Sequence, residues 1–288
     1  MTAITASLVR ELREKSGAAM MDCKKALEAT GGDMEAAFDE LRKAGLKTAA
    51  KKAGRTTGEG RVWCSLSDDA KKGAMVAISC ETDFVANTPD FDGFLKDLAA
   101  HVLEHAPGDV AACLGQTWKG EGTVEEALKA LIGRLGENIL ISDVCTYEAQ
   151  GGAVQAYVHH DNKKGAIVAV DAGGTPDGDV LRDLCMHIVV FNPGALNRDA
   201  IDASLVEREK AIIKEDLTGK PAEIQEKIMV GRLEKFFAEQ VITEQPWIKD
   251  DKSTVQKALE AAMGAGTTLT AFSRVEVGGD TGDDESED

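Results

Sequence analysis

The sequence predicts an α+β fold: a short helical module, a core of two related α+β subdomains with small antiparallel sheets, and an inserted helical hairpin. The main indication is an internal repeat, because residues 60–78 and 152–170 align without a gap at an offset of 92 and share Lys-Lys-Gly-Ala. Apolar residues at helical spacing in the first 45 positions, and again in a highly charged stretch after residue 192, predict the helical parts.

The first 55 residues are predicted to form the helical module and a basic linker. Three short helices are expected, with Gly17 ending the first and Asp33 placed to cap the third. Residues 47–55 are rich in Lys and Ala and are expected to lead out of the module. Residues 1–55 carry a net charge of +3, which leaves −20 for the remainder of the chain.

Each copy of the repeat is predicted to fold as strand, turn, strand and helix. In the first copy, alternating apolar residues precede a polar turn, and residues 75–78 form an apolar run that is typical of a buried strand. An amphipathic helix at 124–135 and a third strand near 140–147 follow. These elements predict a first subdomain that spans 56–148.

The second subdomain is predicted to be interrupted. It comprises 149–192 and 233–266, and residues 193–232 are expected to form the inserted helical hairpin, a coiled coil that turns at Gly219-Lys220-Pro221. Ile201, Leu205 and Ile212 stand at helical spacing before that turn. The last segment, 267–288, is predicted to be a C-terminal module that ends in a disordered tail, since six of the final eleven residues are acidic.

The two copies differ in length at one place. Leu95 matches Leu181, and His101 matches His187, at an offset of 86 instead of 92, so the first copy carries six extra residues. The excess lies in a polar stretch that contains Phe84. A large apolar side chain on a polar loop marks a contact more often than a packing need, so this loop is predicted to bind a partner.

A structural interpretation of the same stretch stays open. Residues 82–89 could begin a helix, with Thr82 or Asp83 as its N-cap. Even then Phe84 would stand near an exposed helix start.

The composition argues against several classes of function. A net charge of −17 does not suit a surface that follows nucleic-acid phosphates, so protein partners are favoured and no direct nucleic-acid contact is expected. Six scattered cysteines form no Cys-x-x-Cys pair, which indicates neither a zinc site nor a disulfide framework, and no cofactor is expected. No apolar run is long enough for a membrane span and no secretory signal is present, so a cytoplasmic protein without membrane contact is predicted.

No enzymatic constellation can be identified. His159-His160-Asp161 is the best candidate for metal or acid–base chemistry, but adjacent strand residues point to opposite faces, so a surface turn is favoured, with partner contact as the alternative. The two histidines matched in the repeat are interpreted as hydrogen-bonded structural residues. A thiol-dependent enzyme that uses Cys80 is a further alternative, although no nearby His or Lys would lower the pKa of that thiol.

Seven motifs occur in the order found in translation elongation factor Ts, and the chain resembles that family from end to end apart from the acidic tail. The motifs are Met20-Met21-Asp22-Cys23-Lys24-Lys25-Ala26-Leu27, Thr82-Asp83-Phe84-Val85, Gly136-Glu137-Asn138-Ile139, Met186-His187-Ile188, Glu226-Lys227-Ile228, Gly231-Arg232-Leu233 and Glu244-Gln245-Pro246.

The resemblance implies both a fold and a function. It implies a ubiquitin-associated-like helical N-terminal domain before the duplicated core and the hairpin. It also implies a guanine-nucleotide exchange factor that binds the GDP form of elongation factor Tu and releases GDP without covalent chemistry. In the family, the loop matched by Thr82, Asp83, Phe84 and Val85 is pushed beside the magnesium and phosphate sites of the GTPase, with Phe84 as the wedge and Asp83 as its polar positioning partner.

The same resemblance implies further partner contacts. Met20, Met21 and Lys24 match residues that dock on the GTPase domain, although helix packing of the methionines and a solvated lysine are the alternatives. Gly136 and His159 stand where the family has a glycine and a histidine near the partner's surface, and the second subdomain is expected to grip another domain of elongation factor Tu.

Some features depart from the family or leave alternatives open. Ala19 replaces a glycine that is usual before the paired methionines, and Asn87-Thr88-Pro89 follows the key loop where a lysine or acid is common. The hairpin could form a homodimer or act only as a lever. The remaining alternative to an exchange factor is a ubiquitin-associated-type binding module on an unrelated scaffold. In that case residues 1–45 would bind a partner without the rest of the chain. The start of the chain favours a bacterial form over an organellar precursor.

Overall fold

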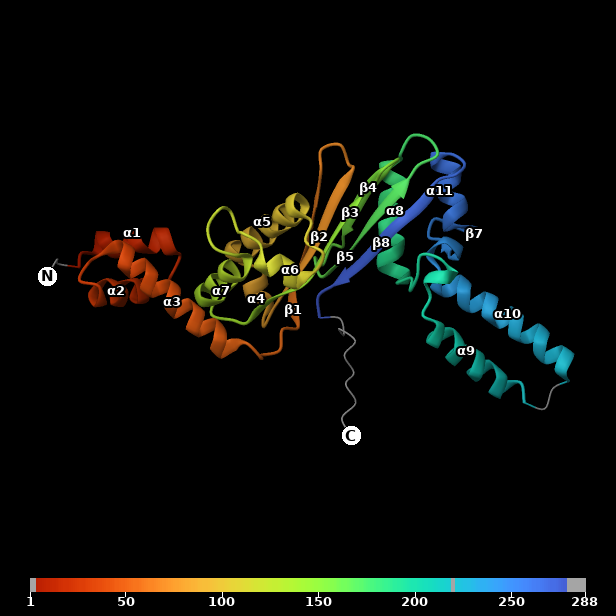
Figure 1. The fold of residues 1–288 in the computed structure, drawn as a ribbon, viewed down its shortest axis with the longest axis horizontal. Helices are drawn as coiled ribbons and strands as arrows, with labels where there is room; N and C mark the ends of the chain where they lie inside the picture. Colours follow the sequence, from red (N-terminus) through yellow and green to blue (C-terminus); the bar gives the residue numbers. More distant parts are fainter. Residues whose placement is uncertain (1–3, 219–220, 279–288) are drawn as a thin grey trace. The chain divides into compact units, whose positions relative to one another are not determined.

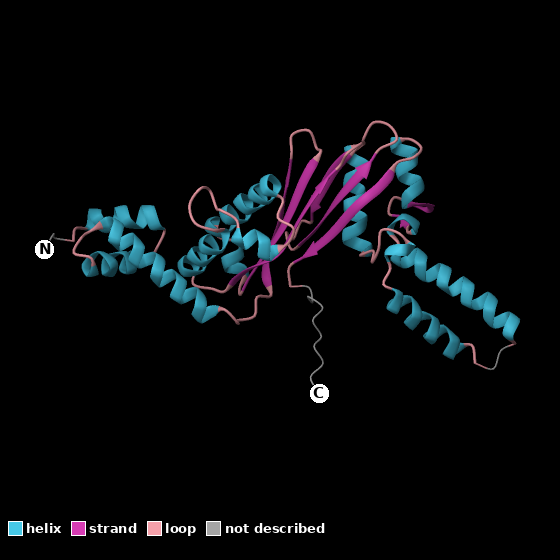
Figure 2. Cartoon of the chain, in the orientation of Figure 1, coloured by secondary structure: helices cyan, strands magenta, loops and turns pink. Residues whose placement is uncertain are grey.

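A computed structural model describes residues 4–218 and 221–278 (Figure 1). The chain forms two compact units. The first unit comprises the described residues within 1–63, 76–145 and 276–288. The second unit comprises the described residues within 64–75 and 146–275. Helices and small sheets occur in both, which confirms the α+β class (Figure 2). The predicted boundaries at 55, 148, 192, 232 and 266 are finer than this division and stay predictions.

The chain begins with three helices, α1 (Ala6–Ser16), α2 (Met20–Ala29) and α3 (Met34–Lys52). Gly17 ends α1 in the left-handed conformation with φ of 65°, and the Asp33 side chain caps α3 by accepting two backbone N–H groups, both as predicted. A small apolar core holds the helices together. It consists of Val9, Leu12, Cys23, Ala26, Leu27 and Ala37.

The third helix is longer than predicted. Residues 47–55 were expected to form a linker, but α3 continues through most of them and reaches Lys52. Alanine and lysine are strong helix formers, and no glycine or proline interrupts the run before Gly54. Helix α3 also packs against α7 (Val124–Leu135), which supplies the tertiary contact that a long helix needs.

The first sheet has the order β1-β2-β3 and contains β1 (Glu59–Leu66), β2 (Lys72–Cys80) and β3 (Ile139–Glu148). The helices that accompany it are α4 (Asp83–Ala86), α5 (Pro89–His105), α6 (Val110–Gly115) and α7. The sequence pattern placed α7 and the third strand correctly.

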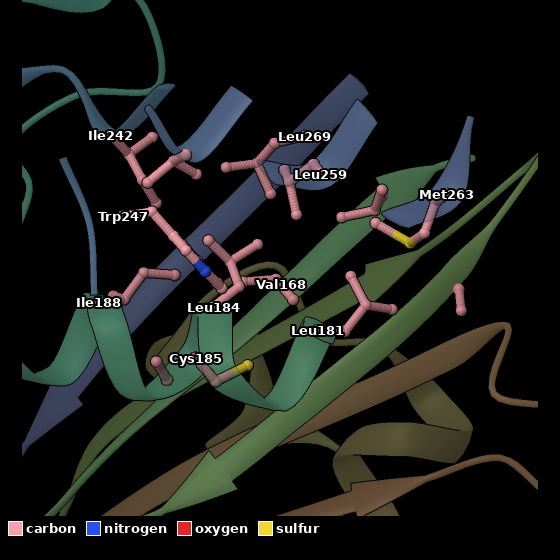
Figure 3. Packing of buried hydrophobic residues seen from close by; sticks show 14 of the residues in the cluster. Val168, Leu181, Leu184, Cys185, Ile188, Ile242, Trp247, Leu259, Met263 and Leu269 are labelled. Atoms are coloured by element: carbon pink, nitrogen blue, oxygen red, sulfur yellow. The ribbon is translucent and has the colours of Figure 1, made fainter. Parts of the chain in front are cut away.

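The second sheet repeats this plan with the order β4-β5-β8. Its strands are β4 (Ala153–Val158), β5 (Lys164–Asp171) and β8 (Thr268–Glu276), and β4 pairs antiparallel with β5 from Ala153↔Val170 to Val158↔Gly165. Helices α8 (Gly178–Phe191) and α11 (Val255–Met263) contribute to its core, together with Trp247 of the short hairpin β6 (Pro246–Trp247) and β7 (Asp250–Thr254). Figure 3 shows Leu184, Ile188, Trp247 and Leu259 within this cluster.

Two charged helices, α9 (Ala203–Asp216) and α10 (Ala222–Gln240), lie between α8 and the short hairpin in sequence and contact each other. Ile213 and Leu217 are the buried apolar residues here, whereas Leu205 and Ile212, which the pattern selected, are exposed. Residues 219–220 of the predicted turn and the acidic tail from residue 279 lie outside the described residues. The predicted coiled coil stays a prediction.

The duplication extends further than the aligned strands. His101 on α5 bonds Gln116 through Nε2 at 2.8 Å, and His187 on α8 bonds Gln245 in the same way at 2.8 Å. These contacts confirm that both histidines are hydrogen-bonded structural residues. A tryptophan two positions beyond each glutamine contacts the histidine ring, Trp118 in the first copy and Trp247 in the second.

Candidate functional site

The predicted partner-binding loop forms the four-residue helix α4 between β2 and α5. Thr82 is its N-cap, and the Thr82 hydroxyl accepts the backbone N–H of Val85. The side chains of Val85 and Ala86 are buried, but Phe84 is 82% exposed. A helix therefore begins here with Thr82 as its N-cap, as the structural interpretation expected, and the aromatic ring lies outside the core. Partner binding by this loop stays a prediction.

A turn that follows α7 holds this loop. The carboxylate of Glu137 accepts the backbone N–H of Thr82 at 3.0 Å and its hydroxyl at 2.6 Å. One residue earlier in the loop, Glu81 accepts the backbone N–H of Asn138 at 2.7 Å and forms an ion pair with Arg55 at 3.2 Å. The hydrogen bond from Asn138 is the main reason that the pKa of Glu81 lies below its usual range.

Gly136 begins the turn that makes these contacts. It ends α7 in the left-handed conformation with φ of 77°, and its N–H bonds the carbonyl of Ile132 at 2.9 Å. Its carbonyl accepts a hydrogen bond from Lys52 at the end of α3. The structure thus brings Gly136 close to the Thr82–Val85 loop, although the two lie far apart in the sequence.

Met20, Met21 and Lys24 form a separate surface at the start of α2. Met20 is 43% exposed and Met21 is 60% exposed, so core packing does not account for the pair. Lys24 is exposed, and its Nζ lies 3.7 Å from Oε1 of Glu28. A hollow of about 840 Å³ adjoins these side chains. Its other lining residues come from the N-terminal segment and α1, and are Ile4, Ala6, Ser7, Val9, Arg10, Glu11 and Glu14.

His159 belongs to the second unit, at the turn between β4 and β5. Its Nδ1 lies 3.1 Å from the Tyr157 hydroxyl, and Asp161 accepts the backbone N–H of Lys163 at 2.9 Å. This confirms the surface turn that the sequence favoured over a metal site. Among residues 4–218 and 221–278, no group of three His, Cys, Asp or Glu side chains could hold a metal ion.

Cys80 does not have the properties of a catalytic thiol. It is buried, and burial followed by the charge of Glu137 raises its pKa to about 12. Its Sγ donates to the carbonyl of Thr82 at 3.1 Å. A thiol that stays protonated near neutral pH is a poor nucleophile, which argues against the thiol-dependent enzyme.

Known proteins of one family match this chain. The family model described as Elongation factor TS matches residues 81–279. The chain belongs to the elongation factor Ts family. An elongation factor Ts of Thioalkalivibrio sulfidiphilus is 44% identical over 277 residues, which cover 96% of this chain and 92% of the relative. Those of Nautilia profundicola and Prosthecochloris aestuarii are 43% and 39% identical, covering 96% of this chain and 94% and 100% of the relatives.

Membership of the elongation factor Ts family makes the chain a translation elongation factor. Members of this family act in protein biosynthesis as nucleotide exchange factors. In the part of the chain that the structure describes, no helix is both long and apolar enough to cross a membrane.

The sequence interpretation gave no role to Glu137 or Asn138, although both belong to a motif that it quoted. The one local signal is an acid directly after a helix-ending glycine, which is too common to be specific. Their importance is visible only in the contacts with Glu81 and Thr82.

Proposed function

We propose that this chain is the guanine-nucleotide exchange factor of elongation factor Tu, and that it binds the GDP form and promotes GDP release. In this proposal Asp83 and Phe84 insert near the magnesium and phosphate sites of the GTPase. The observation that carries the proposal is the 82% exposure of Phe84 on a helix turn whose next two side chains are buried. An anchored turn that exposes an aromatic ring suits insertion into another protein.

Insertion of a ring is physically sufficient for exchange. A GTPase holds GDP through backbone amides around the phosphates and through a magnesium ion, and both depend on accurate placement. Displacing either group weakens nucleotide binding without any bond being made or broken. Coupling is reciprocal, so a factor that weakens nucleotide binding is itself released more readily when nucleotide returns.

The other site residues receive roles in the same proposal. Met20, Met21 and Lys24, on a ubiquitin-associated-like module, dock on the GTPase domain, and Gly136 contacts the partner near the Phe84 loop. His159 belongs to the second subdomain, which contacts another domain of elongation factor Tu. The exposed methionines support the first assignment, because flexible thioether side chains adapt well to a partner surface. Helices α9 and α10 are proposed to be the inserted hairpin.

Replacing Phe84 tests the proposal. We expect Phe84→Ala to slow the release of fluorescently labelled GDP from elongation factor Tu by roughly tenfold or more, because a central aromatic contact is lost. The thermal stability of the factor should change little, because this ring is already exposed to solvent. Stopped-flow fluorescence measures the release, and calorimetry the stability.

Leu140→Ala is the matched control, since Leu140 is an exposed apolar residue on β3 of the first sheet (46% exposed). It should leave the release rate close to that of the unmodified factor. Equal release rates for Phe84→Ala and Leu140→Ala would rule out insertion of Phe84.

A further inference from the structure

Helix α4, which carries Phe84, has only four residues and cannot be stable alone, because an isolated helix needs more than ten residues to repay its nucleation. Its conformation must therefore come from contacts with the rest of the unit. Several of the polar contacts are made by the cap residue Thr82. The Thr82 carbonyl accepts the N–H of Ala86 at 3.3 Å and the Sγ–H of Cys80 at 3.1 Å.

Both hydrogen-bond donors of Thr82 are taken by one carboxylate. The backbone N–H donates to Glu137 Oε2 at 3.0 Å, and the hydroxyl donates to Glu137 Oε1 at 2.6 Å. Because the hydroxyl proton points at Glu137, the lone pairs of Thr82 Oγ1 are free to accept the N–H of Val85 at 3.4 Å. Charge-assisted bonds of this kind are about twice as strong as neutral ones.

We propose that Glu137 is a positioning residue for nucleotide exchange: by holding the N–H and the hydroxyl of Thr82 together, it fixes the direction in which Phe84 projects. The inference rests on the proposed function, since it concerns how the ring that enters the partner is oriented. Glu137 acts through Thr82 and the helix turn, and need not touch the nucleotide.

A second pair of residues strengthens this connection. Glu81 accepts the backbone N–H of Asn138 at 2.7 Å, and the Asn138 side chain donates to the carbonyl of Arg55 at 2.8 Å. Two adjacent loop residues therefore bond two adjacent turn residues. A single bond would allow the loop to rotate, whereas two neighbouring connections restrict that rotation.

The other copy of the repeat offers an internal comparison. After α11 the chain continues Gly264-Ala265, so an alanine follows the helix-ending glycine where Glu137 does in the first copy. The loop before α8 is joined to this connection by a neutral bond, from the N–H of Gly173 to the Thr267 hydroxyl at 3.1 Å. The carboxylate is thus found in the copy that carries the exposed aromatic ring.

The test compares variants on both sides of the contact. Glu137→Ala removes the carboxylate, Thr82→Val removes only the hydroxyl, and Thr82→Ser keeps it. Thr267→Val is the matched control, because it removes the hydroxyl that, in the copy without an aromatic loop, accepts the bond from the loop to the connection after the helix, as the Glu137 carboxylate does in the first copy. Each factor is titrated against elongation factor Tu loaded with labelled GDP, which yields the maximal release rate and the concentration for half-maximal release.

We expect Glu137→Ala and Thr82→Val each to lower the maximal release rate by roughly tenfold, the size of effect given by losing a hydrogen bond to a charged group. The half-maximal concentration should change much less, because the docking surfaces are intact. Thr82→Ser should recover most of the rate, and Thr267→Val should stay within about twofold of the unmodified factor.

The decisive measurement repeats Glu137→Ala in a Phe84→Ala background. If Glu137 acts by orienting the ring, its removal causes no further loss once the ring is gone. A further loss of the same size would overturn the positioning role, because Glu137 would then act independently of Phe84.

Two other results separate this inference from the proposed function. Normal exchange by both Glu137→Ala and Thr82→Val, with slow exchange by Phe84→Ala, would overturn the positioning role alone. Normal exchange by Phe84→Ala would overturn ring insertion and, with it, any role for Glu137 in orienting the ring. If Glu137→Ala does not fold, Thr82→Val and Thr82→Ser decide the question, because they address the same contact.

Discussion

His187 is a fully buried histidine with one nitrogen that lacks a hydrogen-bond partner. Its Nε2 bonds Gln245 at 2.8 Å, its ring stacks on Trp247 with centroids 5.8 Å apart, and Nδ1 has no partner among the described residues. Burial is the main cause that lowers the pKa of His187 below its usual value. The neutral ring is therefore the form that the fold accepts.

This arrangement predicts a loss of stability in mild acid. In the unfolded chain a histidine titrates near pH 6.5, and in the native state the pKa of His187 is lower. The contribution of His187 to the unfolding free energy is therefore complete above about pH 6.5 and declines as the pH falls toward the lowered pKa, because only the unfolded state takes up the proton there. Urea unfolding followed by tryptophan fluorescence at several pH values measures this slope.

His187→Gln is the comparison variant. It should be less stable at neutral pH by about 1–3 kcal/mol, because a buried hydrogen bond and ring contacts are lost. Its unfolding free energy should depend less on pH between about 5 and 6.5. An unchanged pH slope would mean that other groups cause the acid sensitivity.

Helix α7 depends on a glycine at its end. Gly136 has φ of 77°, a left-handed conformation that costs a residue with a side chain about 1–2 kcal/mol. Space is not the obstacle, because no atom lies within 4 Å of a Cβ added there. We expect Gly136→Ala to lower the unfolding free energy by that amount, and Gly136→Asn by less, because asparagine adopts this conformation more readily. Chemical denaturation of both variants tests the order; equal losses would contradict it.

Helices α3 and α7 approach each other closely at two glycines. A Cβ added to Gly133 would lie 2.6 Å from the Cα of Gly45, so backbone would have to move. A Cβ added to Gly45 would meet its nearest atom at 3.9 Å, which is ordinary contact. The close approach therefore depends on the glycine of α7 and not on that of α3.

The two substitutions should have opposite effects. Gly133→Ala is expected to destabilise the protein by about 1–3 kcal/mol through overpacking, and Gly45→Ala to be neutral or stabilising by up to about 1 kcal/mol through higher helix propensity. Thermal unfolding measures both, and limited proteolysis near residues 54–58 reports whether α3 has separated from α7. Equal behaviour of the two variants would contradict the close contact.

At the scale of elements, helix signals in the sequence were accurate where they were local. The predicted helix at 124–135 coincides with α7, and Asp33 caps α3 as expected. The end of α3 was missed because residues 47–52 carry no stop signal and gain their support from α7, a contact that no local pattern records. The apolar spacing in α9 also selected the wrong residues, since Ile213 is buried and Ile212 is exposed.

At the scale of the molecule, the internal repeat predicted most of the architecture. It indicated two α+β subdomains, and the structure adds β8 as the third strand of the second sheet and a matching histidine–glutamine contact in each copy. The candidate site could be predicted only in part. The exposure of Phe84 followed from its polar neighbours, but the contact between Thr82 and Glu137 joins residues 55 positions apart, and a single sequence contains no sign of such a pairing.

The two copies carry their additions at different points. The first copy has extra residues around α4. In the second copy α9 and α10 intervene between the histidine and the glutamine. The offset between the copies therefore grows from 86 for His101 and His187 to 129 for Gln116 and Gln245. Each insertion is thus confined to one copy of a common core.

The acid that holds Thr82 has a consequence for engineering. Transplanting residues 82–87 alone into the loop between β5 and α8 would expose an aromatic ring on a scaffold of the same design, but Ala265 would offer that graft no anchor. A graft that keeps the orientation of the ring consequently needs a pair of segments, the loop together with an acid in the connection after α11, and neither segment should reproduce that orientation when moved without the other.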